Sequence, residues 1–205
     1  MTNYKLTYFD FDGGRAEPVR IAFHAAGIEF EDHRFSFPEF AEIAAKMPFK
    51  AVPALAIDGT QITQSNAMGR YVGKMAGLYP QDDMQALYCD EVMDALEDLT
   101  HELTNTFGME GDALKAAREK LAEGAFPTYI RGLDELLKRG GGEYFADNQL
   151  TMADLKSFVV MSSLTSGHLD HIPADIVERV APDMVAHIER VKADPRVAAY
   201  YASRA

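Results

Sequence analysis

The chain has 205 residues, a length that suits one large domain or two small ones. Hydrophobic residues make up 47% and charged residues 25%, a globular composition that can bury a core without a disulfide or a metal. The formal net charge of −12 argues against binding to nucleic acid or to an anionic membrane surface. No stretch of sequence is apolar and long enough to span a bilayer.

The single cysteine, Cys89, excludes an intrachain disulfide and indicates a reducing compartment. The neighbouring Asp90 and Glu91 oppose thiolate formation, so Cys89 is a poor candidate nucleophile. The first residues lack the basic region and apolar run of a signal peptide. We therefore expect a cytoplasmic protein.

The first 50 residues alternate between extended and helical patterns. Residues 4–9 alternate as a strand does, and a glycine-containing turn follows. Apolar residues within 18–26 can cover one side of a helix, which Gly27 would end. A second strand over 30–35 and a short helix over 40–47 come next.

A hairpin and a helix complete this part of the chain. An Asp-Gly pair at 58–59 separates two extended runs, 51–57 and 60–63, which is a strong hairpin signal. Ser65 is the expected N-cap of a helix over 66–76, because its hydroxyl can satisfy a free amide of the first turn. The order βαβα followed by ββα is typical of a thioredoxin-like domain.

Residues 78–81 are expected to form a linker, and helical patterns dominate beyond them. Thr151 and Asp154 have the spacing of a capping box at the start of one helix. The sequence thus predicts α/β plus all-α: a thioredoxin-like βαβαββα domain over 1–80 and an all-helical domain over 81–205. The other predicted helices span 85–106, 113–121, 127–138 and 184–191, with a short turn at 195–201.

Two residues near the first turn could serve a bound anion. Tyr8 ends the first strand, and a phenol there can donate a hydrogen bond to an anion at the helix start. Taken alone, Tyr8 would be an ordinary strand aromatic. Arg15 lies in the same turn and would otherwise be a solvated residue.

Two further features could hold a peptide with a free carboxylate. Pro53 marks a strand edge or an irregular strand entry. A cis Val52-Pro53 bond would leave the Val52 backbone free to pair with a peptide; a simple edge proline is the alternative. Gln64 and Ser65 precede a helix, whose free amides favour a carboxylate; plain capping is compatible with this.

In this order the motifs resemble those of the cytosolic glutathione transferases, most closely the sigma class. The resemblance is dense over the first 80 residues and thinner beyond. It implies the fold of that family, glutathione as co-substrate, transferase activity, no metal, and a homodimer. It is carried by residues 4–9, 14–17, 31–34, 47–49, 52–53, 64–65, 94–98 and 151–154.

The resemblance implies that Tyr8 stabilises the glutathione thiolate and that Arg15 helps to hold its charge. A donor to the anion lowers the thiol pKa from about 8.5, which increases the nucleophile present at neutral pH. The thiolate would attack a hydrophobic electrophile, in a conjugation or in a glutathione-dependent isomerisation or cleavage.

The other glutathione contacts also follow from the resemblance. Asp98 would reach the γ-glutamyl amine from the partner subunit. Phe40 stands where the sigma class has a tryptophan, and Ala44 stands where it usually has a lysine. Lys46 or Lys50 would replace that missing cation at the glycyl end. The expected contacts are Val52 beside Pro53 for the cysteinyl backbone, Gln64 and Ser65 for the γ-glutamyl carboxylate, and Phe40 and Lys50 for the glycyl end.

The electrophile is expected between Tyr8 and the helical half. Asp12 brings a negative charge to this region, which favours neutral or cationic electrophiles. Thr100 and Asn105 replace a Met and a Trp of the prostaglandin synthases, so the sequence disfavours prostaglandin synthesis. The expected lining is Phe11, Asp12, Gly13, Thr100, His101, Thr104, Asn105 and Phe107.

Two classes of function remain open. The retained Tyr8, Arg15 and Ser65 favour an enzyme, whereas the altered glycyl-end contacts leave a non-catalytic binding or structural protein of the same fold as the alternative. A thioredoxin-type oxidoreductase is excluded, because Cys89 lies outside the first half. The electrophile itself cannot be named from the sequence.

Overall fold

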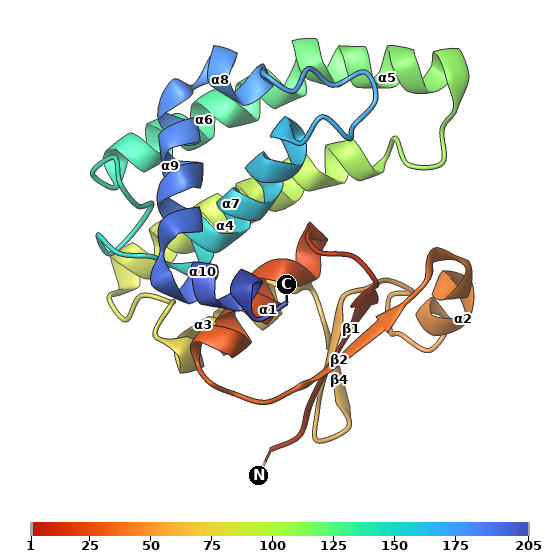
Figure 1. Cartoon of the computed structure of the whole chain (residues 1–205), viewed down its shortest axis with the longest axis vertical. Coiled ribbons are helices and arrows are strands. Elements are labelled where there is room, and N and C mark those ends of the chain that lie inside the picture. Colours follow the sequence, from red (N-terminus) through yellow and green to blue (C-terminus); the bar gives the residue numbers. More distant parts are fainter. Residues whose placement is uncertain (1, 205) are drawn as a thin grey trace.

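The computed structural model describes residues 2–204 and consists of a small sheet with helices, followed by an all-helical part (Figure 1). The sheet has the strand order β2-β1-β3-β4, with β2 parallel to β1 and the other pairs antiparallel. This confirms the predicted βαβα then ββα order. The strands are β1 Tyr4–Phe9, β2 Glu31–Phe35, β3 Ala54–Ile57 and β4 Thr60–Thr63.

Two helices of the first half lie between the sheet and the helical part (Figure 1). Helix α1 (Glu17–Ala25) buries the predicted apolar face and packs on α3 (Ser65–Ala76) as well as on α7 and α10. Helix α2 (Phe40–Ala44) lies at the far side of the sheet. Short 3₁₀ turns, η1 (Gly14–Ala16) and η2 (Phe37–Glu39), precede α1 and α2.

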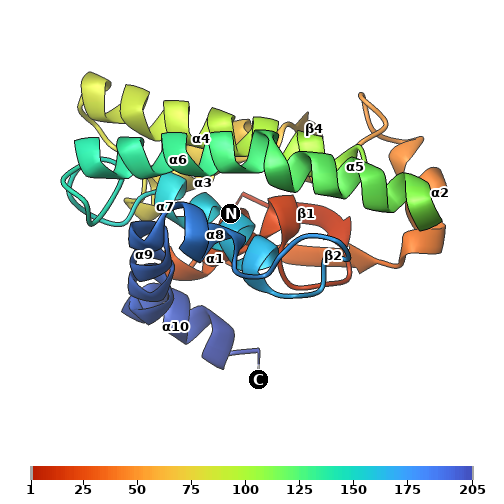
Figure 2. The same ribbon diagram turned by 90° about the horizontal axis from the view of Figure 1, so that it is seen from above.

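The second half contains helices around α7 (Figure 2). Helix α7 is buried on nearly every side and packs on α4, α9 and α1, as expected for a helix that is apolar all round. Its central position makes it the main support for any site between the halves. The helices are α4 Asp83–Thr104, α5 Gly111–Glu123, α6 Ala125–Arg139, α7 Met152–Thr165, α8 Ile176–Val180, α9 Pro182–Ala193 and α10 Pro195–Ala202.

The capping box at the start of α7 is confirmed. Asp154 Oδ2 accepts hydrogen bonds from the Thr151 amide (2.8 Å) and hydroxyl (2.6 Å). Its other oxygen accepts from the Phe145 amide and contacts His187 Nε2, both at 3.0 Å. Because Asp154 is buried, these bonds compensate its charge and fix the start of α7 against α9.

Some boundaries differ from the prediction. The assignment of Ser65 as an N-cap is wrong: α3 begins at Ser65, Gln64 is the N-cap residue with φ 76°, and no side chain caps the helix. The Ser65 hydroxyl instead donates to Glu97. The short turn predicted at 195–201 is the helix α10, whose N-cap Asp194 accepts from the Arg196 amide.

The segment predicted as a linker is packed rather than loose. Leu78 is buried, and its carbonyl accepts a 2.8 Å hydrogen bond from the Met152 amide at the start of α7. A domain boundary at residue 80 stays a prediction. Within residues 2–204, every helix is too short or too polar to cross a membrane.

Candidate functional site

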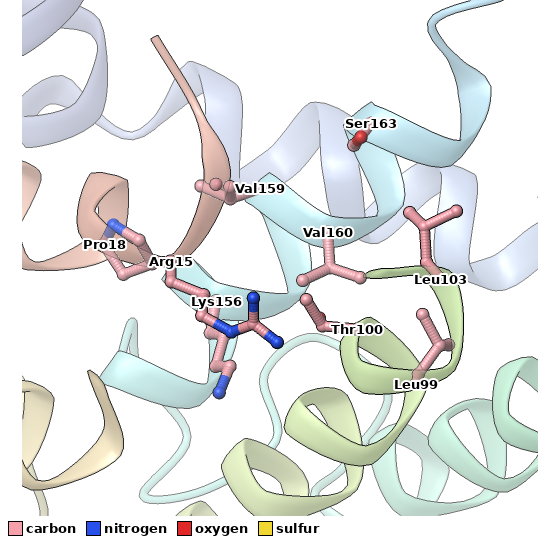
Figure 3. A pocket seen from close by; sticks show the side chains of 10 residues that line it. Arg15, Pro18, Leu99, Thr100, Leu103, Lys156, Val159, Val160 and Ser163 are labelled. Carbon is pink, nitrogen blue, oxygen red and sulfur yellow. The ribbon is translucent and has the colours of Figure 1, made fainter. Parts of the chain in front are cut away.

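Two cavities lie where the first half meets the helical half. The polar cavity has a volume of about 320 Å³, and the apolar cavity, shown in Figure 3, has about 60 Å³. Arg15 lines both of them. The polar cavity is lined by Arg15, Phe49, Ala51, Val52, Pro53, Thr63, Gln64, Ser65, Glu97, His101 and Thr104. The apolar cavity is lined by Gly14, Arg15, Pro18, Leu99, Thr100, Leu103, Lys156, Val159, Val160 and Ser163.

Tyr8 lies at the end of β1, directly beneath the turn that carries Arg15. Its side chain is buried, and its hydroxyl oxygen accepts a 3.2 Å hydrogen bond from the Arg15 amide. Gly14 makes room for this hydroxyl: an added Cβ would lie 2.7 Å from it, and φ at Gly14 is +66°. Only glycine suits both the backbone conformation and the close approach.

Burial raises the pKa of Tyr8, and the Arg15 amide and the charges of Arg15 and Arg20 only partly offset that effect. Tyr8 is therefore protonated at neutral pH. Its oxygen accepts from the Arg15 amide, and within residues 2–204 the hydroxyl hydrogen has no recorded acceptor, so it can be donated to an anion. Tyr8 itself lines neither cavity and lies behind Gly14 and Arg15, which do.

The Arg15 side chain belongs to a cluster of charged groups centred on Glu97, on α4. Arg15 Nε donates to Glu97 Oε1 (2.6 Å), while Lys156 Nζ (2.7 Å) and Ser65 Oγ (3.1 Å) donate to Glu97 Oε2. Lys156 Nζ also donates to Asn66 Oδ1 on α3. We call Arg15, Glu97 and Lys156 the cavity cluster, because it forms the wall between the polar and the apolar cavity.

The cavity cluster keeps Glu97 ionised. Burial acts to raise the pKa of Glu97, but the charge and hydrogen bond of Lys156, and then those of Arg15, outweigh it and lower this pKa to about 2. Burial lowers the pKa of Lys156, and Glu97 opposes that shift. A short charge-assisted contact of this kind holds both cations in place.

The structure brings together most of the predicted glutathione residues. Arg15, Val52, Pro53, Gln64 and Ser65 all line the polar cavity. The Val52-Pro53 bond is cis, as the peptide-pairing hypothesis required. The edge position is wrong, because Pro53 lies at the entry to β3 (Ala54–Ile57), which is paired with β1 and β4 on its two sides. The cavity thus offers the backbone of Val52, just before β3, and the start of α3 among its lining, which suits a peptide with a carboxylate.

Other predicted contacts lie away from this lining. Phe40 packs against Phe9 with ring centroids 5.4 Å apart. Lys46 pairs with Glu42 at 2.8 Å on the surface, and Lys50 is exposed. Asp98 is exposed on α4, as a residue that reaches a partner subunit would be.

The residues predicted for the electrophile are divided among several places. Thr100 lines the apolar cavity, whereas His101 and Thr104 line the polar cavity with the glutathione candidates. The Phe11 ring packs 5.6 Å from the Tyr8 ring. Gly13 precedes η1, and Asn105 and Phe107 are exposed near the end of α4.

Asp12 is paired with two arginines and lines neither of the two cavities. Its carboxylate pairs with Arg34 at 3.2 Å and with Arg204 at 2.7 Å. Both guanidinium groups are shared, since Arg34 also contacts Asp32 at 2.7 Å and Arg204 lies 3.9 Å from Asp32. The preference for neutral or cationic electrophiles stays a prediction.

Sequence reasoning missed Glu97 and Lys156. Glu97 stands beside Asp98, the carboxylate that the sequence did single out. Lys156 is a charged residue within a largely apolar helical segment, and that contrast was its signal. Cys89, by contrast, is buried, and its burial raises its pKa to about 12, so it is unreactive as expected. Across residues 2–204, no group of three or more His, Cys, Asp and Glu side chains is placed to hold a metal ion.

A thioredoxin-like sheet with an all-helical second part, and a peptide-sized cavity between them, defines the glutathione transferase class of fold. A family model described as the N-terminal domain of glutathione S-transferase matches residues 4–74, and a C-terminal domain model matches 97–204.

Individual relatives agree with these matches. Glutathione S-transferase 3 of Caenorhabditis elegans is 36% identical over 171 residues, 81% of each chain. Hematopoietic prostaglandin D synthase of Gallus gallus is 33% identical over 204 residues, 100% of this chain and 98% of that one. The solved structure of prostaglandin synthase D of Nilaparvata lugens has a TM-score of 0.86 at 29% identity, covering 99% of this chain and 98% of that one.

The chain belongs to the glutathione S-transferase family, which confirms the resemblance seen in the sequence. Its function is that of a glutathione S-transferase enzyme, and glutathione is its co-substrate.

Proposed function

We propose that Tyr8 stabilises the glutathione thiolate and that this thiolate attacks an electrophilic carbon. The observation that supports it most is the Tyr8 hydroxyl, which is buried, protonated and already fixed by the Arg15 amide. Its free hydrogen would be donated to the sulfur, and Arg15 would add positive charge beside it. Both interactions favour the thiolate over the thiol and so increase the nucleophile at neutral pH.

Glutathione would occupy the polar cavity. The backbone of Val52 would pair with the cysteinyl residue, and the start of α3 at Gln64 and Ser65 would receive the γ-glutamyl carboxylate. His101 and Thr104 line the opposite wall and would contact either glutathione or the entering electrophile. The Lys50 and Phe40 contacts with the glycyl end remain predictions from the sequence.

The electrophile would bind beside Arg15, where the apolar cavity opens between η1, α4 and α7 (Figure 3). Its lining is mostly aliphatic, from Leu99, Leu103, Val159 and Val160. Burial of an apolar group there is favourable by about 25 cal/mol per Å². A hydrophobic electrophile is therefore the substrate class that the site fits.

The proposed chemistry has a direct test. The purified protein is passed over immobilised glutathione and assayed with an aryl halide and an isothiocyanate, beside Tyr8→Phe. We expect Tyr8→Phe to retain glutathione but to lose about 100-fold in kcat, as when one donor to a developing anion is removed. Equal turnover by Tyr8→Phe, with an unchanged pH profile, would show that Tyr8 has no catalytic role.

A second candidate activity is glutathione-dependent isomerisation. The sequence disfavours prostaglandin synthesis, because Thr100 and Asn105 differ from the prostaglandin synthases. Relatives named prostaglandin D synthase nevertheless favour testing this activity. Incubation with a prostaglandin endoperoxide and glutathione separates the two, since an isomerase yields product without consuming glutathione.

We also propose a homodimer in which Asp98 of one subunit reaches the glutathione of the other. Large apolar side chains are exposed on the loop before β3 and on α3 and α4: Phe49, Tyr71, Met75, Met84 and Leu87. Sedimentation tests the dimer. Asp98→Ala should weaken glutathione binding, while Glu102→Ala, one turn further along α4, should not; equal affinities would remove Asp98 from the site. A cytoplasmic location remains a prediction from the sequence.

A further inference from the structure

Lys156 is an unusual side chain for its position. It lies on α7 among buried residues and is only 8% exposed. A charged ammonium group in such a place is costly unless other groups compensate it. Its partners are Glu97 Oε2 at 2.7 Å and Asn66 Oδ1, so the group is satisfied by two different helices, α4 and α3.

The Lys156 ammonium lies behind the proposed reaction site rather than in it. In Figure 3 the Lys156 ammonium points away from Val159 and Val160, and only its aliphatic stem faces the apolar cavity. The Arg15 guanidinium points toward Thr100. Arg15 Nε is bonded to Glu97, and within residues 2–204 no hydrogen bond occupies its two outer nitrogens. Lys156 therefore acts on the cavities through Glu97 and Arg15.

The charges of the cavity cluster do not cancel. Arg15 and Lys156 contribute two positive charges and Glu97 one negative charge. The Asn66 amide, whose oxygen accepts from Lys156, donates to Asp94 at 2.6 Å. Asp94 shares Arg70 (3.4 Å) with Asp90 (2.7 Å), so these three side chains together carry one negative charge. Within the cavity cluster itself the cations outnumber the carboxylate by one, and one of those cations, Arg15, lies beside Tyr8 and the proposed thiol position. The opposing negative charge of Asp90 and Asp94 lies on the Asn66 side of Lys156.

We propose that Lys156 is a positioning residue that shares Glu97 with Arg15 and so leaves Arg15 a net cation toward the glutathione sulfur. Without Lys156, Glu97 would neutralise Arg15 fully, and the wall between the two cavities would carry no net charge. A surplus cation near the sulfur favours the thiolate, and it also attracts electrophiles that bear or develop negative charge. This inference rests on the proposed function, since it needs glutathione in the polar cavity.

The test is a pH titration of the thiol of enzyme-bound glutathione, followed by thiolate absorbance in the ultraviolet, together with the pH dependence of kcat/KM. Lys156→Met keeps an unbranched apolar stem, shorter by one atom, and removes the charge. We expect the thiol pKa to rise by about 1 and turnover at neutral pH to fall about tenfold. Lys156→Arg keeps the charge and should restore both values toward the wild type.

Two variants keep the result interpretable. Lys156→Gln retains a hydrogen-bond donor without the charge and should raise the thiol pKa even if Lys156→Met fails to fold. Lys115→Met removes the same charge from an exposed place on α5 and should leave the thiol pKa unchanged.

The outcomes distinguish a failure of the proposed function from a failure of the role proposed for Lys156. A wild-type protein that does not lower the thiol pKa of glutathione contradicts the proposed function itself. A wild type with a lowered thiol pKa, and Lys156 variants that fold and titrate identically to it, would overturn the role of Lys156 alone.

Discussion

Two clusters of charged side chains join the first half of the molecule to its helices, and they differ in access. The cavity cluster is partly open, with Arg15 22% and Glu97 30% exposed. The second, which we call the core cluster, consists of Glu17, Arg20 and Asp32. Arg20 and Glu17 have no exposed side-chain surface.

The charged groups of the core cluster have hydrogen-bond partners within the cluster and in neighbouring residues. Arg20 donates at 3.1 Å to Glu17 Oε2, to Asp32 Oδ1 and to the Phe11 carbonyl, and Tyr200 donates to Glu17 Oε1 at 3.1 Å. It therefore fixes the turn after β1 and fastens α10 to α1. The cavity cluster leaves the outer nitrogens of Arg15 beside a cavity. Both clusters contain buried charges, but only the cavity cluster has charged atoms beside a cavity. The cavity cluster is therefore the better candidate for a chemical role.

The largest effect on stability should come from breaking the core cluster. Arg20→Met leaves Glu17 buried without its charge partner, which typically costs about 3–5 kcal/mol. We expect the free energy of unfolding from urea titration to fall by that amount. Arg131→Met, at an exposed place on α6, should change it by less than about 0.5 kcal/mol. Equal stability of the two variants would show that the core cluster is not structural.

Gly14→Ala should lower both stability and turnover, because Gly14 lies in the turn that the core cluster and the cavity cluster both contact. Its φ of +66° and a Cβ position 2.7 Å from the Tyr8 hydroxyl make alanine strained there, at a cost of about 1–3 kcal/mol. Gly77→Ala is the matched control, since Gly77 has φ +65° but no atom within 4 Å of an added Cβ. Both variants should lose stability, and only Gly14→Ala should lose turnover. Similar kcat values in both would contradict the close fit between Gly14 and Tyr8.

Ser65→Ala tests the cavity cluster, the more exposed of the two clusters. Ser65 donates to Glu97 and lies at the start of α3, so its loss removes a hydrogen bond to a charged group, worth about 1.5–3 kcal/mol. That energy belongs to folding, so we expect the free energy of unfolding to fall by about this amount. The KM for glutathione should also rise, because Ser65 lines the polar cavity and is proposed to contact the γ-glutamyl carboxylate. Ser163→Ala, in the apolar cavity, should leave this KM unchanged. A rise in both variants would assign the effect to general loosening.

The smallest effect concerns acid stability. The pKa of Glu97 is lowered to about 2 in the folded protein, below its ordinary value of about 4.3. The sign is that of a depressed carboxylate: its stabilisation is present above pH of about 4.3 and is lost as the pH falls toward 2. The Tm difference between wild type and Glu97→Gln should therefore shrink over this range. A constant difference would show that Glu97 is not ionised in the fold.

The sequence predicted the fold well, and the site in part. Periodicity and turn residues located every strand. The capping box of Thr151 and Asp154 was predicted correctly because its two residues are close in the sequence. Ser65 was misassigned as an N-cap because its hydroxyl donates a hydrogen bond to a carboxylate distant in the sequence, Glu97. Glu97 and Lys156 were missed for the same reason: their pairing joins residues 59 positions apart, which local patterns do not reveal.

Other differences have similar causes. Helix α8 is short, and it is held by packing on α6, α7 and α9 rather than by its own periodicity. The charge of Asp12 could be judged only once Arg34 and Arg204 were in place around it. Sequence reasoning thus identified the residue types at the site, but not which charges remain uncompensated there.

The most direct test of the account is the pKa of the glutathione thiol when bound to the wild type and to Tyr8→Phe. With Tyr8 as the donor, the wild type should hold this pKa well below its free value of about 8.5, and Tyr8→Phe should return it close to that value. Calorimetry should show that both proteins bind glutathione with similar affinity. A thiol pKa that is equally low in Tyr8→Phe would contradict the central claim.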